Sequence, residues 1–327
     1  MVDASGPPSW LADARGRRLF VLGADGFIGS EVVRASLAAG AHVVAACVKK
    51  PWRLRPVAGH DGLELVEIQG ARWSEVERWG SLRRSLAEAD ALALLAYAPP
   101  PAGAAPSERL RHEREVNARG ARAVAEAARQ AGAAVIFASS VDVYGPWHAS
   151  AVDEETEPAP ATPYAVAKLE AEEAVAELTS CLVLRIATVY GPREDGPRAI
   201  PSFVRAIRRG EAPAIHGDGS DVRDYVHVRD VAAAFVNAAI RVLDRRDRRL
   251  VVNVGSGIGR TTLEVLHSVA AIMDVATRPR HVPIRRPPSR LVIDPALARR
   301  LLRFHPRSDF DAALREEVAW LLAETHG

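Results

Sequence analysis

The chain has 327 residues, of which 48% are apolar, and its formal net charge is +2. This length and composition suffice for a large core in one or two domains, and the small net charge argues against a nucleic-acid-binding surface. No apolar run approaches the roughly 18 residues that a membrane helix needs. Because Cys47 and Cys181 are the only cysteines, we expect neither a disulfide framework nor a metal site. These features predict a cytoplasmic protein, with residues 1–16 as a disordered leader.

An apolar segment at residues 18–22 runs into a glycine-rich turn, and an amphipathic segment follows it. Gly23, Gly26 and Gly29 allow a tight turn and a close approach of the backbone to a pyrophosphate at the N-terminus of the next helix. The spacing G-x-x-G-x-x-G differs from the commoner G-x-G-x-x-G. The order of strand, glycine turn and helix still predicts dinucleotide binding.

Short apolar segments alternate with helical stretches along the first part of the chain, at residues 43–46, 63–66, 91–95, 134–137 and 182–184. This alternation predicts an α/β fold, a Rossmann-type doubly wound parallel sheet formed by residues 17–186. Beyond Gly191, prolines interrupt the pattern. We expect residues 187–327 to form a smaller C-terminal substrate-binding domain, with a strand near 250–254 that returns to the sheet.

Tyr164 and Lys168 lie four residues apart, and Lys168 is one of three lysines in a chain with 40 arginines. Thr162 and Pro163 suit the N-cap and the first helical position, so the pair shares one face of a helix start. A phenol titrates near 10, and lowering its pKa to about 7 takes roughly 4 kcal/mol, which a desolvated ammonium can supply. We therefore predict that Tyr164 acts as an acid and a base beside Lys168, although this spacing also occurs in exposed helix contacts.

Ordered motifs extend over nearly the whole chain. They are Gly23-Ala-Asp-Gly26-Phe-Ile-Gly29, Val116-Asn117, Ser139-Ser140-Val-Asp142-Val-Tyr144-Gly145, Tyr164 with Lys168, Val189-Tyr190-Gly191-Pro192-Arg193, Arg223-Asp224-Tyr225 and Asn253-Val254-Gly255. In these motifs the chain resembles the extended short-chain dehydrogenase/reductases, a family of nucleotide-sugar epimerases, dehydratases and 4-ketoreductases. The resemblance implies a nucleotide-diphosphate sugar as the ligand. It also implies a homodimer that pairs the helices near residues 108–130 and 164–178.

The resemblance also assigns roles to individual residues. It implies that Ser140, Tyr164 and Lys168 are catalytic, with Lys168 lowering the pKa of the tyrosine and holding the nicotinamide ribose. The implied cofactor contacts are Gly23, Gly26, Phe27, Ile28, Gly29, Ala96, Asn117, Tyr164 and Lys168. The implied substrate contacts are Asp142, Thr188, Arg193 and Arg223, of which Arg223 would grip the diphosphate.

The loop after the second predicted strand departs from the pattern of NAD-preferring members, which carry an Asp there. This chain has Cys47 at that place, followed by Lys49, Lys50 and Arg53. A basic loop attracts the 2′-phosphate that an Asp would repel, so we predict NADP(H) in preference to NAD(H). The alternative is that the two lysines belong to a solvated turn. A second Asp of the family, which contacts adenine, is replaced by Ala71.

The residues beside Ser140 bear on the reaction. Dehydratases of the family have an acidic pair there, and this chain has Val141 and Asp142. Because elimination needs both an acid and a base, the single carboxylate argues against a dehydratase. The basic loop after the second predicted strand then favours an NADPH-dependent reductase of a 4-keto sugar, with an NAD-dependent 4-epimerase as the alternative. A dehydratase and a protein that binds the cofactor without catalysis are weaker alternatives.

Overall fold

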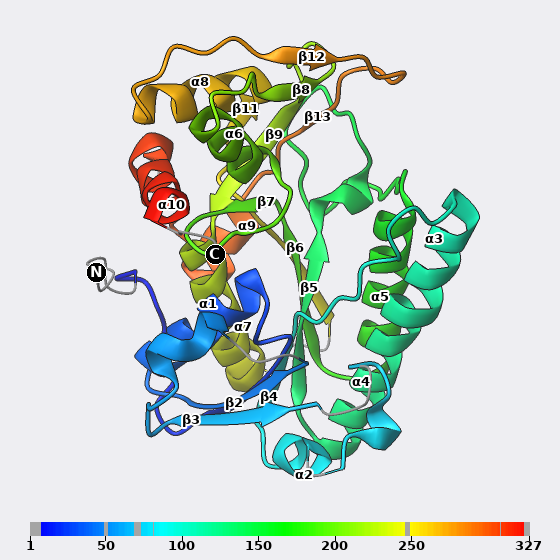
Figure 1. Cartoon of the computed structure of the whole chain (residues 1–327). Coiled ribbons are helices and arrows are strands. Elements are labelled where there is room, and N and C mark those ends of the chain that lie inside the picture. Colours follow the sequence, from blue (N-terminus) through cyan, green and yellow to red (C-terminus); the bar gives the residue numbers. More distant parts are fainter. Residues whose placement is uncertain are drawn as a thin grey trace.

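The computed structural model describes residues 8–48, 52–68, 73–80, 82–245, 249–307 and 309–323. Seven parallel strands form its main sheet, in the order β10-β6-β5-β4-β1-β2-β3 (Figure 1). The strands are β1 (Arg18–Leu22), β2 (His42–Cys47), β3 (Leu63–Glu67), β4 (Ala91–Leu94), β5 (Ala134–Ser140), β6 (Cys181–Ile186) and β10 (Arg249–Val254). The central strands are buried on both faces and mostly apolar because helices cover both sides. The predicted α/β fold class is confirmed.

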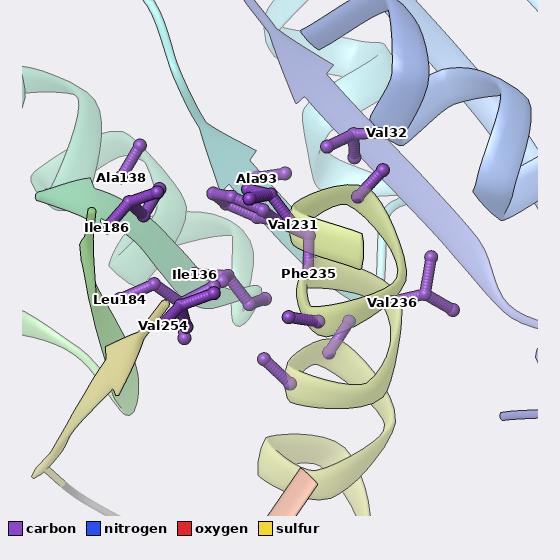
Figure 2. Packing of buried hydrophobic residues seen from close by; sticks show 14 of the residues in the cluster. Val32, Ala93, Ile136, Ala138, Leu184, Ile186, Val231, Phe235, Val236 and Val254 are labelled. Carbon is purple, nitrogen blue, oxygen red and sulfur yellow. The ribbon is translucent and has the colours of Figure 1, made fainter. Parts of the chain in front are cut away.

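One face of the main sheet is covered by α1 (Phe27–Ala38) and α7 (Val228–Arg245), which also pack on each other. Figure 2 shows Val231 and Phe235 of α7 close to Ala93 and Ile136 of the sheet. The opposite face is covered by α2 (Leu82–Ala87), α4 (Arg119–Ala131) and α5 (Pro163–Leu178). Both layers bury alanine and valine, whose small side chains allow close contact between helix and strand.

Short helical elements join these layers. They are η1 (Trp52–Val57), η2 (Val76–Arg78), α3 (Pro106–His112), η3 (Glu113–Ala118) and η4 (Val141–Tyr144). Of these, η3 is a π-helical turn that lies between α3 and α4 without a break in the chain. Such turns are rare in proteins, and many of those known lie at functional sites.

A smaller layer lies above the carboxyl ends of the main strands (Figure 1). In it β9 (Val222–His227) pairs with β7 (Thr188–Tyr190), β11 (Gly259–Thr261) and β13 (Arg290–Leu291), and β8 (Ala214–His216) pairs with β12 (Arg280–Val282). Its helices are α6 (Ala199–Arg208), α8 (Thr262–Ile272) and α10 (Phe310–Ala323), and they enclose a separate apolar cluster.

The C-terminal part of the chain does not lie wholly in the smaller layer. Both α7 and β10 belong to the main sheet and its cover, and α9 (Ala296–Leu302) packs against both of them. The division of the chain into two domains at residues 186 and 187 stays a prediction. In the structure, α7, α9 and β10 lie with the main sheet although they come after this boundary.

Residues 8–16 differ from the predicted disordered leader. Trp10 packs edge-on against Phe304 at 5.5 Å between ring centroids, and Ala14 is fully buried. Asn237 of α7 accepts a hydrogen bond from the Ala12 amide at 2.8 Å. Partners more than 200 residues away hold this segment, which a local sequence pattern does not reveal. Residues 1–7 lie outside the described part of the chain.

Candidate active site

A cavity of about 470 Å³ opens where β1, β5 and β6 end, beneath the smaller layer. It brings together ten of the predicted site residues. They are Gly23, Gly26, Phe27, Ile28, Gly29, Ser140, Asp142, Tyr164, Lys168 and Thr188. Segments that are far apart in sequence therefore meet at one end of the parallel sheet, where doubly wound folds bind their ligands.

The glycine turn fits the backbone of a dinucleotide. Gly23 has a φ of +91°, and a Cβ there would lie 2.7 Å from the amide nitrogen of Ala96, which follows β4. A Cβ on Gly29 would lie 2.1 Å from the carbonyl oxygen of Gly23. The two glycines let the turn fold tightly against β4 and α1. The N-terminus of α1, with Gly26 as its N-cap and no side-chain cap, faces the cavity and can accept a pyrophosphate.

The first turn of α5 carries Tyr164 and Lys168 on the cavity wall. The Thr162 hydroxyl caps this helix by accepting the Ala165 amide at 3.1 Å, and Pro163 is its first residue, as predicted. The Lys168 ammonium donates to the Ala138 carbonyl at 2.7 Å. It lies 5.7 Å from the centroid of the Tyr164 ring, so the two side chains are neighbours on one helix face.

The pKa of Tyr164 is higher than that of a free phenol, whereas the sequence predicts a lower value. Burial raises it to about 12, and the charge of Asp142 adds to the rise, whereas Arg198 and a hydrogen bond with Ser140 lower it. Burial lowers the pKa of Lys168 to about 8, opposed by the carboxylates of Glu113 and Glu172. The residues of this protein therefore do not by themselves bring the pKa of Tyr164 to about 7.

Ser140 is the last residue of β5 and the N-cap of η4. Its hydroxyl accepts a hydrogen bond from the Asp142 amide at 3.2 Å. A buried ion pair lies beside the end of β5, where Arg185 Nη2 is 2.8 Å from Glu172 Oε2. The preceding Ser139 hydroxyl donates to the same glutamate. Because Glu172 lies on α5, Ser139 on β5 and Arg185 on β6, these two contacts join the helix of Tyr164 to the strand of Ser140 and to the neighbouring strand.

A buried carboxylate, Glu113, lies behind Tyr164 and Lys168. It accepts the Tyr97 hydroxyl at 2.6 Å and the side-chain amide of Asn117 at 2.7 Å. The ring of Tyr97 meets that of Tyr164 edge-on at 5.4 Å. Asn117 also exchanges hydrogen bonds of 2.9 Å with both backbone groups of Ala98, so it fixes the segment after β4. Asn117 and Ala96 line a smaller cavity beside the main one.

Carboxylates flank the end of β2, where the resemblance places the adenosine ribose. Burial raises the pKa of Cys47 to about 12, and the nearby charges of Asp25 and Glu67 raise it further. Arg53 is used inside the protein, because its guanidinium donates to the carbonyls of Asp25 and Arg193 and pairs with Asp195 at 2.5 Å. Lys49, Lys50 and Ala71 lie outside the described residues.

On the substrate side, Thr188 and Asp142 line the cavity, whereas Arg193 and Arg223 do not. Arg193 donates to Glu31 of α1 at 2.8 Å through Nε, so it ties the smaller layer to the dinucleotide side. Arg223 lies on β9, and its Nη1 is buried without a hydrogen-bond partner in the described part of the chain. Their predicted contacts with a substrate stay predictions.

Two charged residues near the site escaped the sequence prediction. Glu113 lies four residues before Asn117, which is a helical spacing that could have pointed to it. Arg198 lines the cavity from the N-cap position of α6, and no motif marks it. Within the described ranges, no group of three or more His, Cys, Asp or Glu side chains could hold a metal ion.

The doubly wound sheet, the glycine turn and the Ser140, Tyr164 and Lys168 group together define a dinucleotide-dependent enzyme of the short-chain dehydrogenase/reductase type. The chain belongs to the NAD dependent epimerase/dehydratase family, whose model matches residues 19–255. The predictions of the family and of an enzyme are confirmed.

Individual proteins are similar over most of the chain. The UDP-glucose 4-epimerase of Mycolicibacterium smegmatis is 30% identical over 323 residues, which cover 92% of this chain and 96% of that protein. The UDP-glucose 4-epimerase of Thermotoga maritima, solved with UDP-glucose, gives a TM-score of 0.77 at 27% identity, with 93% and 98% of the two chains covered. The dTDP-glucose 4,6-dehydratase of Streptomyces venezuelae, solved with NAD, gives 0.79 at 25% identity, with 93% and 96% covered.

Proposed function

We propose that this protein is an NAD-dependent 4-epimerase of a nucleotide-linked sugar. The observation that carries the proposal is a pair of carboxylates at the end of β2, where Glu67 of β3 pairs in register with Cys47 and Asp25 lies in the glycine turn. A 2′-phosphate at this place would be repelled, whereas the free ribose hydroxyls of NAD would not. The similarity to two UDP-glucose 4-epimerases over nearly their whole length supports the same activity.

The cavity residues supply the proton chemistry of such a reaction. Tyr164 takes the proton of the sugar hydroxyl as C4 is oxidised, and returns it when C4 is reduced from the other face. Ser140, whose hydroxyl lowers the pKa of Tyr164 and lines the same cavity, holds the same oxygen. NAD, when bound, accepts the hydride from C4 and gives it back. Lys168 and the N-terminus of α1 would hold this cofactor, at the ribose and at the pyrophosphate.

The predicted NADPH-dependent 4-ketoreductase is the second candidate, and it depends on the loop after β2. Lys49 and Lys50, which favour NADP(H), lie outside the described residues, and Arg53 is held by Asp195 and by two backbone carbonyls. The lysines are therefore the remaining support for this candidate. A dehydratase lacks support at Val141, where the acidic pair of that chemistry would need a second carboxylate.

The proposal is tested by incubating the purified protein with UDP-glucose, UDP-N-acetylglucosamine and UDP-glucuronic acid, without added cofactor, and following the C4 proton by NMR. We expect an equilibrium mixture of C4 epimers from at least one of them, and NAD in the supernatant of the denatured protein. NADPH oxidation by a 4-keto sugar, with no epimer formed, would establish the reductase in its place.

The homodimer and the cytoplasmic location stay predictions. Two ion pairs join η3 and α4 to α5 on the surface that the resemblance assigns to the dimer. They are Arg114 with Glu170 at 2.8 Å and Arg122 with Glu177 at 3.2 Å. No helix in the described ranges is long and apolar enough to cross a membrane.

A further inference from the structure

Arg198 is a cation in the active-site cavity that none of the roles above uses. It lines the cavity at the start of α6, and 58% of its side chain is exposed. Its Nε lies 3.1 Å from Glu194 Oε1. Within the described residues, its two terminal nitrogens form no hydrogen bond. The guanidinium therefore keeps its bidentate edge available to a ligand.

The surroundings of Arg198 leave it with a net attraction for anions. Burial raises the pKa of Glu194 to about 7, so this carboxyl is only partly charged at neutral pH and balances the arginine incompletely. The other charged groups that line the cavity are Asp142 and Lys168, and the Lys168 ammonium is bound to the Ala138 carbonyl. Arg198 and Lys168 are the two cations among the cavity-lining residues that the structure describes, and the proposed function assigns Lys168 to the cofactor, which leaves Arg198 for the substrate.

Arg198 also acts on the reacting end of the cavity. Its charge lowers the pKa of Tyr164, so the guanidinium lies within electrostatic reach of the tyrosine that exchanges the sugar proton. A nucleotide sugar has two places for an anion, which are the diphosphate and an acidic substituent of the sugar. The cation predicted for the diphosphate is Arg223 of β9, which lies outside the cavity lining and whose Nη1 is buried without a partner in the described part of the chain.

We propose that Arg198 binds a carboxylate on the sugar, so that the substrates of this protein are nucleotide-linked uronic acids. The inference rests on the proposed function, because it names the substrate class of the same site. The planar fork of an arginine matches both oxygens of a carboxylate. A neutral hydroxymethyl group at that place would leave the guanidinium without its counter-charge.

The test measures binding, so that it does not depend on turnover. The full-length protein with saturating NAD is titrated calorimetrically with UDP-glucuronic acid, UDP-glucose and UDP. Wild type should bind the uronic acid at least about tenfold more tightly than UDP-glucose, which is about 1.4 kcal/mol. In Arg198→Gln this ratio should fall to about one, and in Arg198→Lys, which keeps the charge but loses the fork, to an intermediate value.

Arg209→Gln is the matched control, because it removes the same charge at the other end of α6, where Arg209 pairs with the exposed Glu211. It should leave the ratio unchanged. The inference is overturned if wild type shows no preference for the uronic acid, if no ligand binds, or if Arg198→Gln weakens all three ligands equally, which would assign Arg198 to the diphosphate. A protein with the Arg198-dependent preference but no epimerisation would refute the proposed reaction and leave this assignment standing.

Discussion

Tyr164 and Lys168 share a cavity wall on which burial favours the neutral form of both side chains. A phenol with a pKa of about 12 is protonated at neutral pH, so the role of Tyr164 as a base requires that the bound cofactor and substrate lower this pKa and that the phenol be aligned with the substrate hydroxyl. Ser140 and the buried Arg185 and Glu172 pair supply that alignment. At this scale, catalysis rests on fixed geometry together with one proton-transfer group.

We expect Tyr164→Phe to lower kcat by about 10³-fold, because a positioned acid and base contributes about 10² to 10⁴. NAD affinity should change little, since the phenol hydroxyl serves the sugar. Steady-state kinetics and a fluorescence titration with NADH measure the two effects. A kcat within tenfold of wild type would refute the assigned role of Tyr164.

Glu113→Gln tests the electrostatic contact behind the site. The Glu113 charge raises the pKa of Lys168, and its loss should bring that pKa below its present value of about 8. Lys168 then loses its charge at a lower pH, so the alkaline limb of the profile of kcat/KM against pH should move to lower pH. Glu170→Gln, which removes an exposed carboxylate from α5, is the control. An unmoved alkaline limb would exclude this coupling.

At the scale of elements, α10 meets the loop after β7 through two buried carboxyl groups. Glu317 of α10 accepts the Gly191 amide at 2.9 Å and is fully buried, and Glu194 of the loop is 3% exposed. Burial raises the pKa of Glu317, and the nearby Glu194 raises it further. The contact is therefore more favourable when these carboxyl groups are protonated than when both are charged.

Because both pKa values lie above that of an unfolded glutamate, the folded state holds protons that the unfolded state has lost. Their stabilisation is complete below about pH 4.5, the unfolded pKa, and is lost as the pH rises through the folded value of about 7. Glu317→Gln keeps an acceptor for Gly191, and at pH 8 it should raise the free energy of unfolding by about 2 kcal/mol. Urea unfolding at pH 6 and pH 8 measures this. Exposed Glu211→Gln should not change the pH slope, and a Glu317→Gln slope equal to that of wild type would contradict the prediction.

At the scale of the whole molecule, Asn237 joins three distant segments. Its side chain binds the Ala12 amide, the Trp10 carbonyl at 3.0 Å and the Leu302 carbonyl at 2.7 Å. The N-terminal segment, α7 and the end of α9 are thereby held together on one side of the main sheet. Such a contact orders the start of the chain without any local pattern.

Asn237→Ala leaves two carbonyls and an amide without this partner, and each unsatisfied buried group costs about 1–3 kcal/mol. We expect a loss of about 2 kcal/mol, which in a chain of this size lowers the Tm by roughly 3 °C. Thermal unfolding followed by circular dichroism measures it. Gln130→Ala, at an exposed amide on α4, should change the Tm by less than about 1 °C. Equal Tm values for Asn237→Ala and wild type would show that the N-terminal segment adds no stability.

The sequence by itself determined the features that depend on neighbouring residues. The alternation of apolar and helical segments predicts the parallel sheet, the Thr162 cap and the four-residue spacing place Tyr164 with Lys168, and the glycine turn marks the cofactor site. Each follows from helix or strand periodicity or from backbone sterics, which act over a few residues.

Only the tertiary structure decided which side chains meet across the fold. In it Arg53 binds the Arg193 carbonyl and the Asp195 carboxylate. Glu113 lies close enough to Lys168 to raise its pKa, and Arg198 lines the cavity. The tertiary structure also raises the pKa of Tyr164, where the sequence predicts a fall. Ion pairing and desolvation depend on distances between segments remote in the chain, and these distances are set by how the layers pack.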